Sequence, residues 1–539
     1  MIQLTKKQRF TLSISAGLLL ILSFPFTGSI PFLAFLGLVP ILLIEDSIFS
    51  HNYKSTKIFI HSYITFFLYN LGTTWWIWNA SPGGAILAFV LNSFIMALVF
   101  QLFHVTKKRV GIREGYIAFI LFWIGFEYIH YEWELSWPWL NFGNVFASSP
   151  KLVQWYSISG VLGGTCWILI INLVIFFLVK HLYFQKKTIQ SQRNLLFFLT
   201  TILIFPIIYS LVQYYSYEDI GKKTEIIVTQ PNVDPYNEKF TGNVEKQLDK
   251  VCDLADALIT PKTEFVLAPE TALPFNFYED EVERIIHYHY LVERKAKWNN
   301  SSLLIGASTS KFFKNKHSRA SRKIQGGPGY EEHYNSSMLI DQHDKPRFLH
   351  KSKLVLGVEK IPFSNIFPSL EQLSIDNGGA SGTLGIEDYA QVFNTKGIKI
   401  APIVCYESLY GSFVAEQCHK GAELLFVLTN DGWWGNTPGY KQHRAFSQLR
   451  AIENRKSVAR SANTGISCFI NQRGDILSET SWWKETSLRE TLKRNKEKTF
   501  YANNGDLIGR TFGAGALVLL VVTLGKVFRK YMYKSKEEN

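Results

Sequence analysis

Long apolar runs occupy both ends of this 539-residue chain, whereas its middle alternates short apolar and polar segments. A helix needs about 20 mostly apolar residues to cross the hydrocarbon core of a bilayer. Eight runs approach that length, and the pattern therefore predicts an eight-helix transmembrane bundle. Their approximate ranges are 9–26, 29–44, 58–79, 83–105, 115–131, 157–180, 194–214 and 511–528. The first run could instead be a signal peptide, but no clear small-residue cleavage site follows it, so we interpret it as a retained anchor.

Basic residues gather on alternate loops between these runs. Lysine and arginine precede the first run and follow the second, fourth, sixth and eighth, while the other short loops nearly lack them. Because cytoplasmic loops carry this excess, we predict that both termini are cytoplasmic and that the segment between the last two runs faces the other side of the membrane. The net charge of +13 is therefore partly a topology signal, and nucleic-acid binding is not indicated.

From about residue 224, short strands alternate with amphipathic helices, which predicts an α/β layered domain of roughly 290 residues. We expect strands at 225–230, 264–268, 302–307, 336–341, 346–351, 400–405, 423–428, 466–470 and 475–478. Helices are expected at 245–258, 281–296 and 440–456, and the segment 311–333, rich in Lys, Arg and Gly, is expected to be an exposed, mobile insertion. The predicted domains are a transmembrane domain at 1–215, a soluble domain at 216–508, and a last helix with a basic tail at 509–539.

Aromatic residues gather at the predicted outer ends of the helices. They are Trp75, Trp76, Trp78, Trp133, Trp137, Trp139 and Trp155. Such residues commonly form an interfacial belt. The loop Ser136–Gly143 could instead be a rigid element that guides lipid, and Glu127, near the end of the fifth run, is expected at the interface or facing the bundle.

The segment Ala401–Ser408 is a strand-like run that ends in Cys405, which makes this thiol a candidate nucleophile. The alternative is that Cys405 is a small buried apolar residue, as most free cysteines are. The other cysteines lie in an apolar run, in two predicted helices and in one predicted strand. None of the five forms a CxxC pair or a His/Cys cluster, so neither a disulfide framework nor a metal site is predicted.

Three polar residues each follow or end a predicted strand: Glu270, Lys351 and Cys405. If the three strands are neighbours in one sheet, a carboxylate, an ammonium and a thiol meet at one edge. That set suffices for acyl transfer, because the carboxylate can take the thiol proton and the ammonium can stabilise the thiolate and the oxyanion. Taken singly, Glu270 could be a helix N-terminal acid and Lys351 a surface cation beside Lys353.

These residues and their neighbours resemble the Glu-Lys-Cys nitrilase superfamily. The matching motifs are Pro269–Pro274, Lys351 after His350, Cys405–Glu407, Asn430–Trp434 and Arg450–Arg455. Seven apolar runs before the domain and one after it are similar to the apolipoprotein N-acyltransferase family of the bacterial inner membrane. The resemblance implies an αββα sandwich in the periplasm, anchored by the helices.

The resemblance also implies roles for individual residues. Cys405 would take a fatty acyl chain from a phospholipid as a thioester and pass it to the α-amine of a diacylglyceryl-cysteine that begins an apolipoprotein. Glu270 would be the base, Lys351 the oxyanion stabiliser, and Glu359, Tyr406 and Glu407 supporting residues. No cofactor is expected.

The residues implied in substrate binding are Trp433, Trp434, Phe240 and Trp139. Trp433 and Trp434 match a mobile aromatic arm near the mouth of the site, although ordinary loop packing could also explain them. Phe240 takes the approximate place of a family tryptophan near the lipid entrance, and Trp139 lies in a Pro-Trp-Leu-Asn outer loop like that of the family.

The chain departs from the family pattern at Leu354–Glu359, at Ala268 and in the 311–333 insertion, which leaves the lid geometry and the acyl-donor preference open. Two other functions remain possible on the sequence. One is a membrane-tethered amidase of the nitrilase type, and the other is a transporter or sensor with an inactive outer domain. The eight apolar runs favour the acyltransferase, since an enzyme that takes both substrates from a bilayer needs its thiol near the lipid surface.

Overall fold

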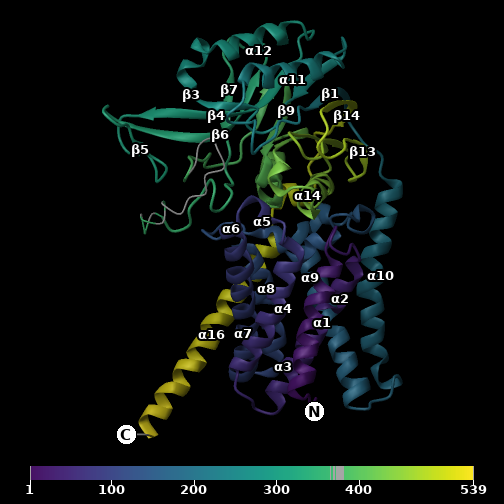
Figure 1. Cartoon of the computed structure of the whole chain (residues 1–539). Coiled ribbons are helices and arrows are strands. Elements are labelled where there is room, and N and C mark those ends of the chain that lie inside the picture. Colours follow the sequence, from purple (N-terminus) through teal and green to yellow (C-terminus); the bar gives the residue numbers. More distant parts are fainter. Residues whose placement is uncertain (1, 365, 368, 370, 372–381, 538–539) are drawn as a thin grey trace. The chain divides into compact units, whose positions relative to one another are not determined.

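The computed structural model describes residues 2–364, 366–367, 369, 371 and 382–537 (Figure 1). The described chain forms two compact units. The helical unit comprises residues 1–78, 82–215 and 506–539, and the α/β unit comprises residues 79–81 and 216–505.

The helical unit contains helices at all eight predicted apolar runs. Its main helices are α1 (Lys6–Ser23), α3 (Val39–Ser50), α4 (Thr56–Thr74), α7 (Ser93–Arg109), α8 (Ile112–Ile129), α9 (Tyr156–Val179), α10 (Arg193–Ser216) and α16 (Leu507–Glu537). Among the described residues, five helical stretches are long and apolar enough to cross a membrane: Pro31–Ser50, Pro82–Arg109, Tyr156–Phe184, Gln190–Ser216 and Leu507–Lys530. The helices α1, α4 and α8 are not among these five.

Glu127, on α8, faces the interior of the helical unit. Its carboxylate accepts hydrogen bonds from Thr165 Oγ1 at 2.6 Å, from the Phe142 main-chain N–H at 2.9 Å and from Trp123 Nε1 at 3.1 Å. Buried carboxylates are tolerated when such donors replace water. Glu127 therefore holds the loop that follows α8 against α9, and of the two expected positions the structure shows the one inside the bundle.

A second group of buried charges joins three helices of this unit. Lys107 Nζ, on α7, lies 2.6 Å from Glu45 Oε2 and 3.5 Å from Asp46 Oδ1, both on α3. His104 Nδ1 lies 2.8 Å from Glu45 Oε1, and Lys180 Nζ, from the end of α9, lies 2.6 Å from Asp46 Oδ1. Since the two carboxylates are almost fully buried, these cations compensate charges that would otherwise be costly.

The α/β unit contains two sheets. The larger has the order β14-β1-β2-β4-β6-β5, with β3 paired to β4 and β7 paired to β6, and the smaller has the order β13-β12-β11-β10-β9-β8. The strands of the larger sheet are β1 (Lys222–Gln230), β2 (Thr263–Leu267), β3 (Leu273–Tyr278), β4 (Ser302–Phe313), β5 (Arg322–Lys323), β6 (Tyr330–Ile340), β7 (Arg347–His350) and β14 (Thr486–Arg494). Those of the smaller are β8 (Phe393–Thr395), β9 (Ile398–Val404), β10 (Leu424–Thr429), β11 (Ser457–Ala462), β12 (Cys468–Ile470) and β13 (Ile476–Glu479).

Helical crossovers make the central strands of each sheet parallel. β1 pairs with β2 and β2 with β4, and α11 (Val244–Asp256) and α12 (Ile286–Ala296) lie in the connections. In the smaller sheet β9, β10 and β11 pair in parallel through α13 (Gly411–His419) and α14 (Pro438–Asn454). Parallel strands need such crossovers, and their carboxyl ends then lie at one edge of the sheet.

Two apolar layers hold the unit together. One lies between the sheets and includes Val228, Phe265 and Leu304 from the larger sheet and Phe426 and Ala459 from the smaller. The other lies between the larger sheet and α11 and α12, which cover its outer face (Figure 1). On the smaller sheet α13 contacts β9 and α14 contacts β11. The expected α/β layered domain is confirmed.

The structure differs from the sequence-based expectations in the 311–333 segment and in one helix. Strand β4 continues to Phe313 and β6 begins at Tyr330, so that Lys311 pairs with Glu332 in the antiparallel ladder. The two ends of the expected insertion are therefore strand. The expected helix at 281–296 is also interrupted, because a 3₁₀ turn over Glu279–Arg284 precedes α12.

Among the described residues, five strands were not expected from the sequence: β3, β5, β8, β11 and β14. β11 is fully buried although its sequence is Ser-Val-Ala-Arg-Ser-Ala, and β14 is a largely polar edge strand that pairs with β1. Neither strand has the apolar composition on which strand prediction relies.

We predict that Lys107→Met destabilises the helical unit by about 3–5 kcal/mol, since it leaves Glu45 and Asp46 buried with less compensating charge. Thermal unfolding of the detergent-solubilised full chain would show this as a lower midpoint. Lys108→Met is the matched control, because no ion pair of Lys108 occurs among the described residues. Equal midpoints for the two variants would contradict the prediction.

Candidate active site

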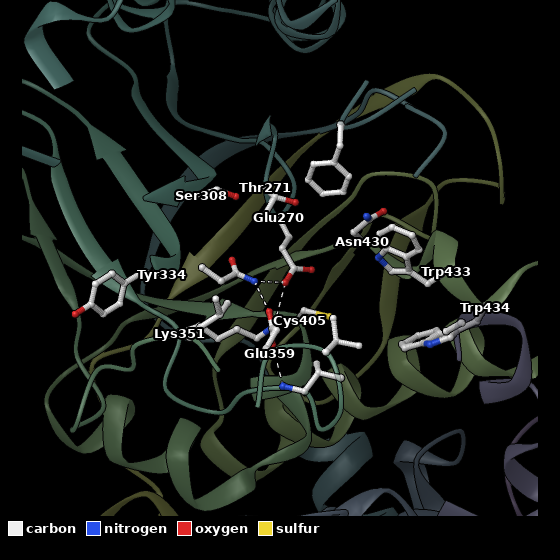
Figure 2. A pocket seen from close by; sticks show the side chains of 16 residues that line it. Glu270, Thr271, Ser308, Tyr334, Lys351, Glu359, Cys405, Asn430, Trp433 and Trp434 are labelled. Atoms are coloured by element: carbon white, nitrogen blue, oxygen red, sulfur yellow. Dashed lines mark hydrogen bonds and ion pairs between the residues drawn. The ribbon is translucent and has the colours of Figure 1, made fainter. Parts of the chain in front are cut away.

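The loops after β2, β7 and β9 bring together the three residues that the sequence singled out. Glu270 lies three residues after β2, Lys351 directly follows β7, and Cys405 directly follows β9. Figure 2 shows their side chains around one cavity. The three side chains meet although the stated condition, that their strands are neighbours in one sheet, is not fulfilled: β2 and β7 belong to the larger sheet without pairing with each other, and β9 belongs to the smaller one. The site therefore lies where the edges of the two sheets meet.

Lys351 lies between two buried carboxylates. Its Nζ is 3.1 Å from Glu270 Oε1 and 2.9 Å from Glu359 Oε2. Asn335 Nδ2, on β6, donates to both carboxylates at 2.8 Å. Glu359 Oε2 also accepts from the Val355 main-chain N–H at 2.8 Å, which fixes the turn that departs from the family pattern. The structure thus places the predicted supporting residue Glu359 beside the other two.

Cys405 occupies a sharp turn between β9 and a 3₁₀ helix over Cys405–Leu409. Its φ of +49° lies in the left-handed region, which few residues other than glycine adopt. Such strain persists only where surrounding contacts enforce it, and it is common at active sites. The turn projects the thiol into the cavity instead of continuing the strand (Figure 2).

Glu407 ties this turn to the strand end that carries Lys351. Its Oε2 accepts from the Val404 main-chain N–H at 2.7 Å, and its Oε1 accepts from the Ser352 main-chain N–H at 2.6 Å. Burial raises the pKa of Glu407 to about 7, although these two amides favour its charged form. The neighbouring Tyr406 is also buried, with its ring 5.5 Å from that of Tyr410.

A buried polar network lies behind the Cys405 turn. His443 Nε2 lies 3.1 Å from the Cys405 carbonyl oxygen, and His443 Nδ1 lies 2.8 Å from Asp431 Oδ1. Arg460 Nη2 donates to Asp431 Oδ2 at 2.6 Å. Donor atoms of Cys405, Asp431 and His443 lie within 4.8 Å of one another, as in some metal sites. Because Asp431 and His443 already bind each other and Arg460, the group is a hydrogen-bond network and not an open metal site.

Electrostatics sets the proton positions in the resting site. Burial and the nearby Glu270 carboxylate raise the pKa of the Cys405 thiol, so the thiol is neutral at neutral pH. Burial by itself would raise the pKa of Glu270, but the Lys351 and Lys239 ammonium groups hold it below its usual value. Burial likewise opposes the charge of Lys351, yet Glu270 and Glu359 raise its pKa. A neutral thiol therefore lies beside an ionised carboxylate and a cation, the pairing that general-base activation requires.

The cavity at this site has a volume of about 160 Å³. Three of the four residues predicted to bind substrate line it: Phe240, Trp433 and Trp434. Trp139 is not among the described residues that line it. That side chain is buried in the helical unit, with its ring 4.8 Å from Trp76 and stacked on Trp137 at 5.7 Å.

Two polar residues of the site were missed in the sequence. Asn335 bridges the two carboxylates from the middle of β6, and Lys239 donates to the main-chain oxygen of Glu270 at 2.9 Å. Lys239 precedes Phe240, which was noticed only as an aromatic. Asn335 had no local signal, because its role depends on the antiparallel register that places it opposite Ser308.

Comparison with known proteins gives matches to both parts of the chain. A family model described as the apolipoprotein N-acyltransferase N-terminal domain matches residues 16–174, and one described as carbon-nitrogen hydrolase matches residues 228–499. The solved structure of an amidase from Nesterenkonia aligns with 54% of this chain and 97% of its own, at 16% identity and a TM-score of 0.36.

Curated relatives match over almost the full length. The apolipoprotein N-acyltransferase of Chlorobaculum tepidum is 30% identical over 536 residues, which covers 96% of this chain and 97% of that protein. The apolipoprotein N-acyltransferase of Geobacter metallireducens is 24% identical over 525 residues and covers 95% of each chain. With its helical unit and its carbon-nitrogen hydrolase domain both matched, the chain belongs to the apolipoprotein N-acyltransferase family.

Proposed function

We propose that this membrane protein transfers a fatty acyl chain from a phospholipid to the N-terminal amine of a diacylglyceryl-cysteine on an apolipoprotein, with Cys405 as the carrier. Lipoprotein N-acylation is the activity named for its relatives. The observation that carries the residue assignment is the contact of Lys351 with Glu270 in the cavity that also holds Cys405.

In the first half-reaction Glu270 takes the proton of the Cys405 thiol, and the sulfur attacks the ester carbonyl of the phospholipid. The Lys351 ammonium stabilises the oxyanion of the tetrahedral intermediate, as preorganised cations do in acyl transfer. The carbon–oxygen bond to the glycerol then breaks, and the leaving alkoxide takes the proton from Glu270. The products are a Cys405 thioester and a lysophospholipid.

In the second half-reaction the acceptor amine attacks the thioester. Glu270 removes a proton from the attacking nitrogen, Lys351 again stabilises the oxyanion, and the carbon–sulfur bond breaks. The thiolate recovers its proton from Glu270 and an amide is formed. Between the two steps water must be kept from the thioester. The aromatic side chains of Phe240, Trp433 and Trp434 line the cavity and are suited to exclude water from it.

The cavity of about 160 Å³ is lined by apolar as well as charged residues, including Val355, Val358 and Leu384. An apolar wall beside the thiol suits the first carbons of an acyl chain better than a small polar amide. This favours a lipid donor over the soluble substrates of an amidase.

We further propose that all eight helices cross the bacterial inner membrane, with both termini cytoplasmic and the α/β unit in the periplasm. The alternation of basic loops along the sequence supports this orientation. The transmembrane domain would then comprise residues 1–215, the catalytic domain 216–508, and the last helix with its basic tail 509–539. Both substrates would reach Cys405 by diffusion within the membrane. We also propose that the loop Ser136–Gly143, which contains Trp139, guides lipid toward the site.

The thioester predicts a fatty-acyl adduct on Cys405. Mass spectrometry of the purified full chain, after incubation with phospholipid, should show a mass increase of one acyl chain on the peptide that contains Cys405. Hydroxylamine should remove it, because thioesters react with that nucleophile. Cys418→Ser, which alters a buried cysteine of α13, is the matched control and should keep the adduct, whereas Cys405→Ala should lose it. An active protein with an unmodified Cys405 would overturn the assignment.

Replacing the central cation should slow acylation in the protein that folds. We expect Lys351→Met to reduce the rate of thioester formation by roughly 10²–10³-fold, because the oxyanion loses its main electrostatic partner. Single-turnover mass spectrometry would measure the rate, and Lys353→Met, two residues away, should stay within a few fold of the unaltered protein. A Lys351→Met rate close to that of Lys353→Met would contradict the proposed role.

A further inference from the structure

Lys239 is a second buried lysine behind the catalytic carboxylate. It lies in the loop between β1 and α11, and only 3% of its surface is exposed. Its Nζ donates to the main-chain oxygen of Glu270 at 2.9 Å. The Asn430 amide is assigned the orientation in which its oxygen faces hydrogen-bond donors, and that oxygen then accepts from the same Nζ at 3.1 Å. The reaction steps above do not use this lysine.

The loop that carries Lys239 is held in place on both sides. The main-chain N–H groups of Glu238 and Lys239 donate to the Asp234 carbonyl oxygen at 3.0 and 2.9 Å. Gln247 Nε2, on α11, donates to the carbonyl oxygens of the same two residues at 3.1 and 3.2 Å. Lys239 is therefore a fixed part of the site and not a mobile surface cation.

The bond from Lys239 orients a strained peptide. Thr271, directly after Glu270, has a φ of +46°, which is rare for a β-branched residue. The backbone of Glu270 also passes so close to Gly306 that a side chain there would meet Glu270 Cα at 2.6 Å. The carbonyl that Lys239 binds belongs to the peptide between Glu270 and Thr271, so this contact fixes the backbone from which the catalytic carboxylate projects.

A shared hydrogen-bond acceptor, the side-chain oxygen of Asn430, connects the Lys239 ammonium to a residue that lines the cavity. The oxygen that accepts from Lys239 also accepts from the indole N–H of Trp433 at 3.2 Å. Asn430 and Trp433 lie side by side at the cavity, across from Tyr334 (Figure 2). One cation thus connects the base to an aromatic residue of the substrate cavity.

The charges around Glu270 balance only when Lys239 is counted. Two carboxylates, Glu270 and Glu359, share the single cation Lys351, and Asn335 between them is neutral. A buried site with an excess negative charge binds a proton more readily. Lys239 is the second cation: burial lowers its pKa to about 8, so it keeps its proton at neutral pH. Its charge lowers the pKa of Glu270 together with that of Lys351.

From this geometry we propose that Lys239 is a positioning residue for acyl transfer: its ammonium keeps Glu270 ionised as the base and fixes the Glu270 backbone and the Asn430 side chain. That Glu270 acts as a base rests on the proposed function. The effect of Lys239 on the charge of Glu270 is independent of that function. Other titratable groups near the base are Cys405, whose thiol is neutral, Glu407 in the adjoining turn, and the Asp431–His443 pair behind Cys405.

The test is an infrared titration of the full chain in detergent. A protonated carboxyl has a C=O band that is absent from the carboxylate, and the difference between the unaltered protein and Glu270→Gln assigns the band of Glu270 and removes that of Glu407. In the Lys239→Met background the same difference is taken between the protein with Glu270 and the protein with Glu270→Gln. We expect the Glu270 band obtained in this way to titrate about one pH unit or more higher than in the unaltered protein, the effect typical of losing an opposite charge within 4–6 Å.

Two controls separate charge from folding. Lys239→Arg keeps the cation and should keep the midpoint of the unaltered protein, and Lys246→Met removes an exposed lysine of α11 and should not move it. If Lys239→Met does not fold, Lys239→Gln, which keeps a donor without the charge, replaces it. Equal midpoints in the charged and neutral variants would overturn the proposal. A shifted midpoint in a protein that forms no Cys405 adduct would retain this inference and reject the proposed acyl transfer.

Discussion

The contact of one buried ammonium with two buried carboxylates is the interaction on which the active site depends. Lys351 lies 3.1 Å from Glu270 and 2.9 Å from Glu359. Burial opposes the charges of Glu270 and Lys351, and each of these two groups favours the charged form of the other. The arrangement keeps an ionised carboxylate and a cation beside a neutral thiol. Asn335 Nδ2 donates to Oε1 of both carboxylates, and the Val355 main-chain N–H donates to Glu359 Oε2.

Packing between the two sheets sets the distances within this site. Glu270 and Lys351 come from the larger sheet, whereas Cys405 comes from the smaller. The apolar layer between the sheets, with Phe265 against Phe426 at 5.2 Å between ring centres, therefore fixes how far the thiol lies from its partners. Glu407 adds a polar link between the two sheets, because its carboxylate accepts from the main-chain N–H of Val404, at the end of β9, and from that of Ser352, just after β7. A strained Cys405 backbone is stable only in such a frame.

In the helical unit, as in the candidate site, buried carboxylates are compensated by cations or hydrogen-bond donors. Its buried carboxylates Glu45, Asp46 and Glu127 all have partners, either cations or hydrogen-bond donors. Apart from Trp123, which lies on the same helix as Glu127, these partners come from another helix or loop, so the contacts connect separate segments of the chain. In an integral membrane protein such contacts add specificity to apolar packing, since lipid and side chains are similarly apolar.

Local sequence determined much of this protein. The apolar runs determined where helices form, the strand-like segments predicted an α/β domain, and the motifs around Glu270, Lys351 and Cys405 indicated the family. Only the tertiary structure decided that the three candidate catalytic residues come from two sheets, that Asn335 and Lys239 belong to the site, and that Trp139 is packed against other tryptophans. β11 shows the reason: Arg460, in a fully buried strand of otherwise small uncharged residues, is explained by Asp431, 29 positions earlier. Composition and periodicity describe neighbours along the chain, whereas burial, ion pairing and register depend on residues that only folding brings together.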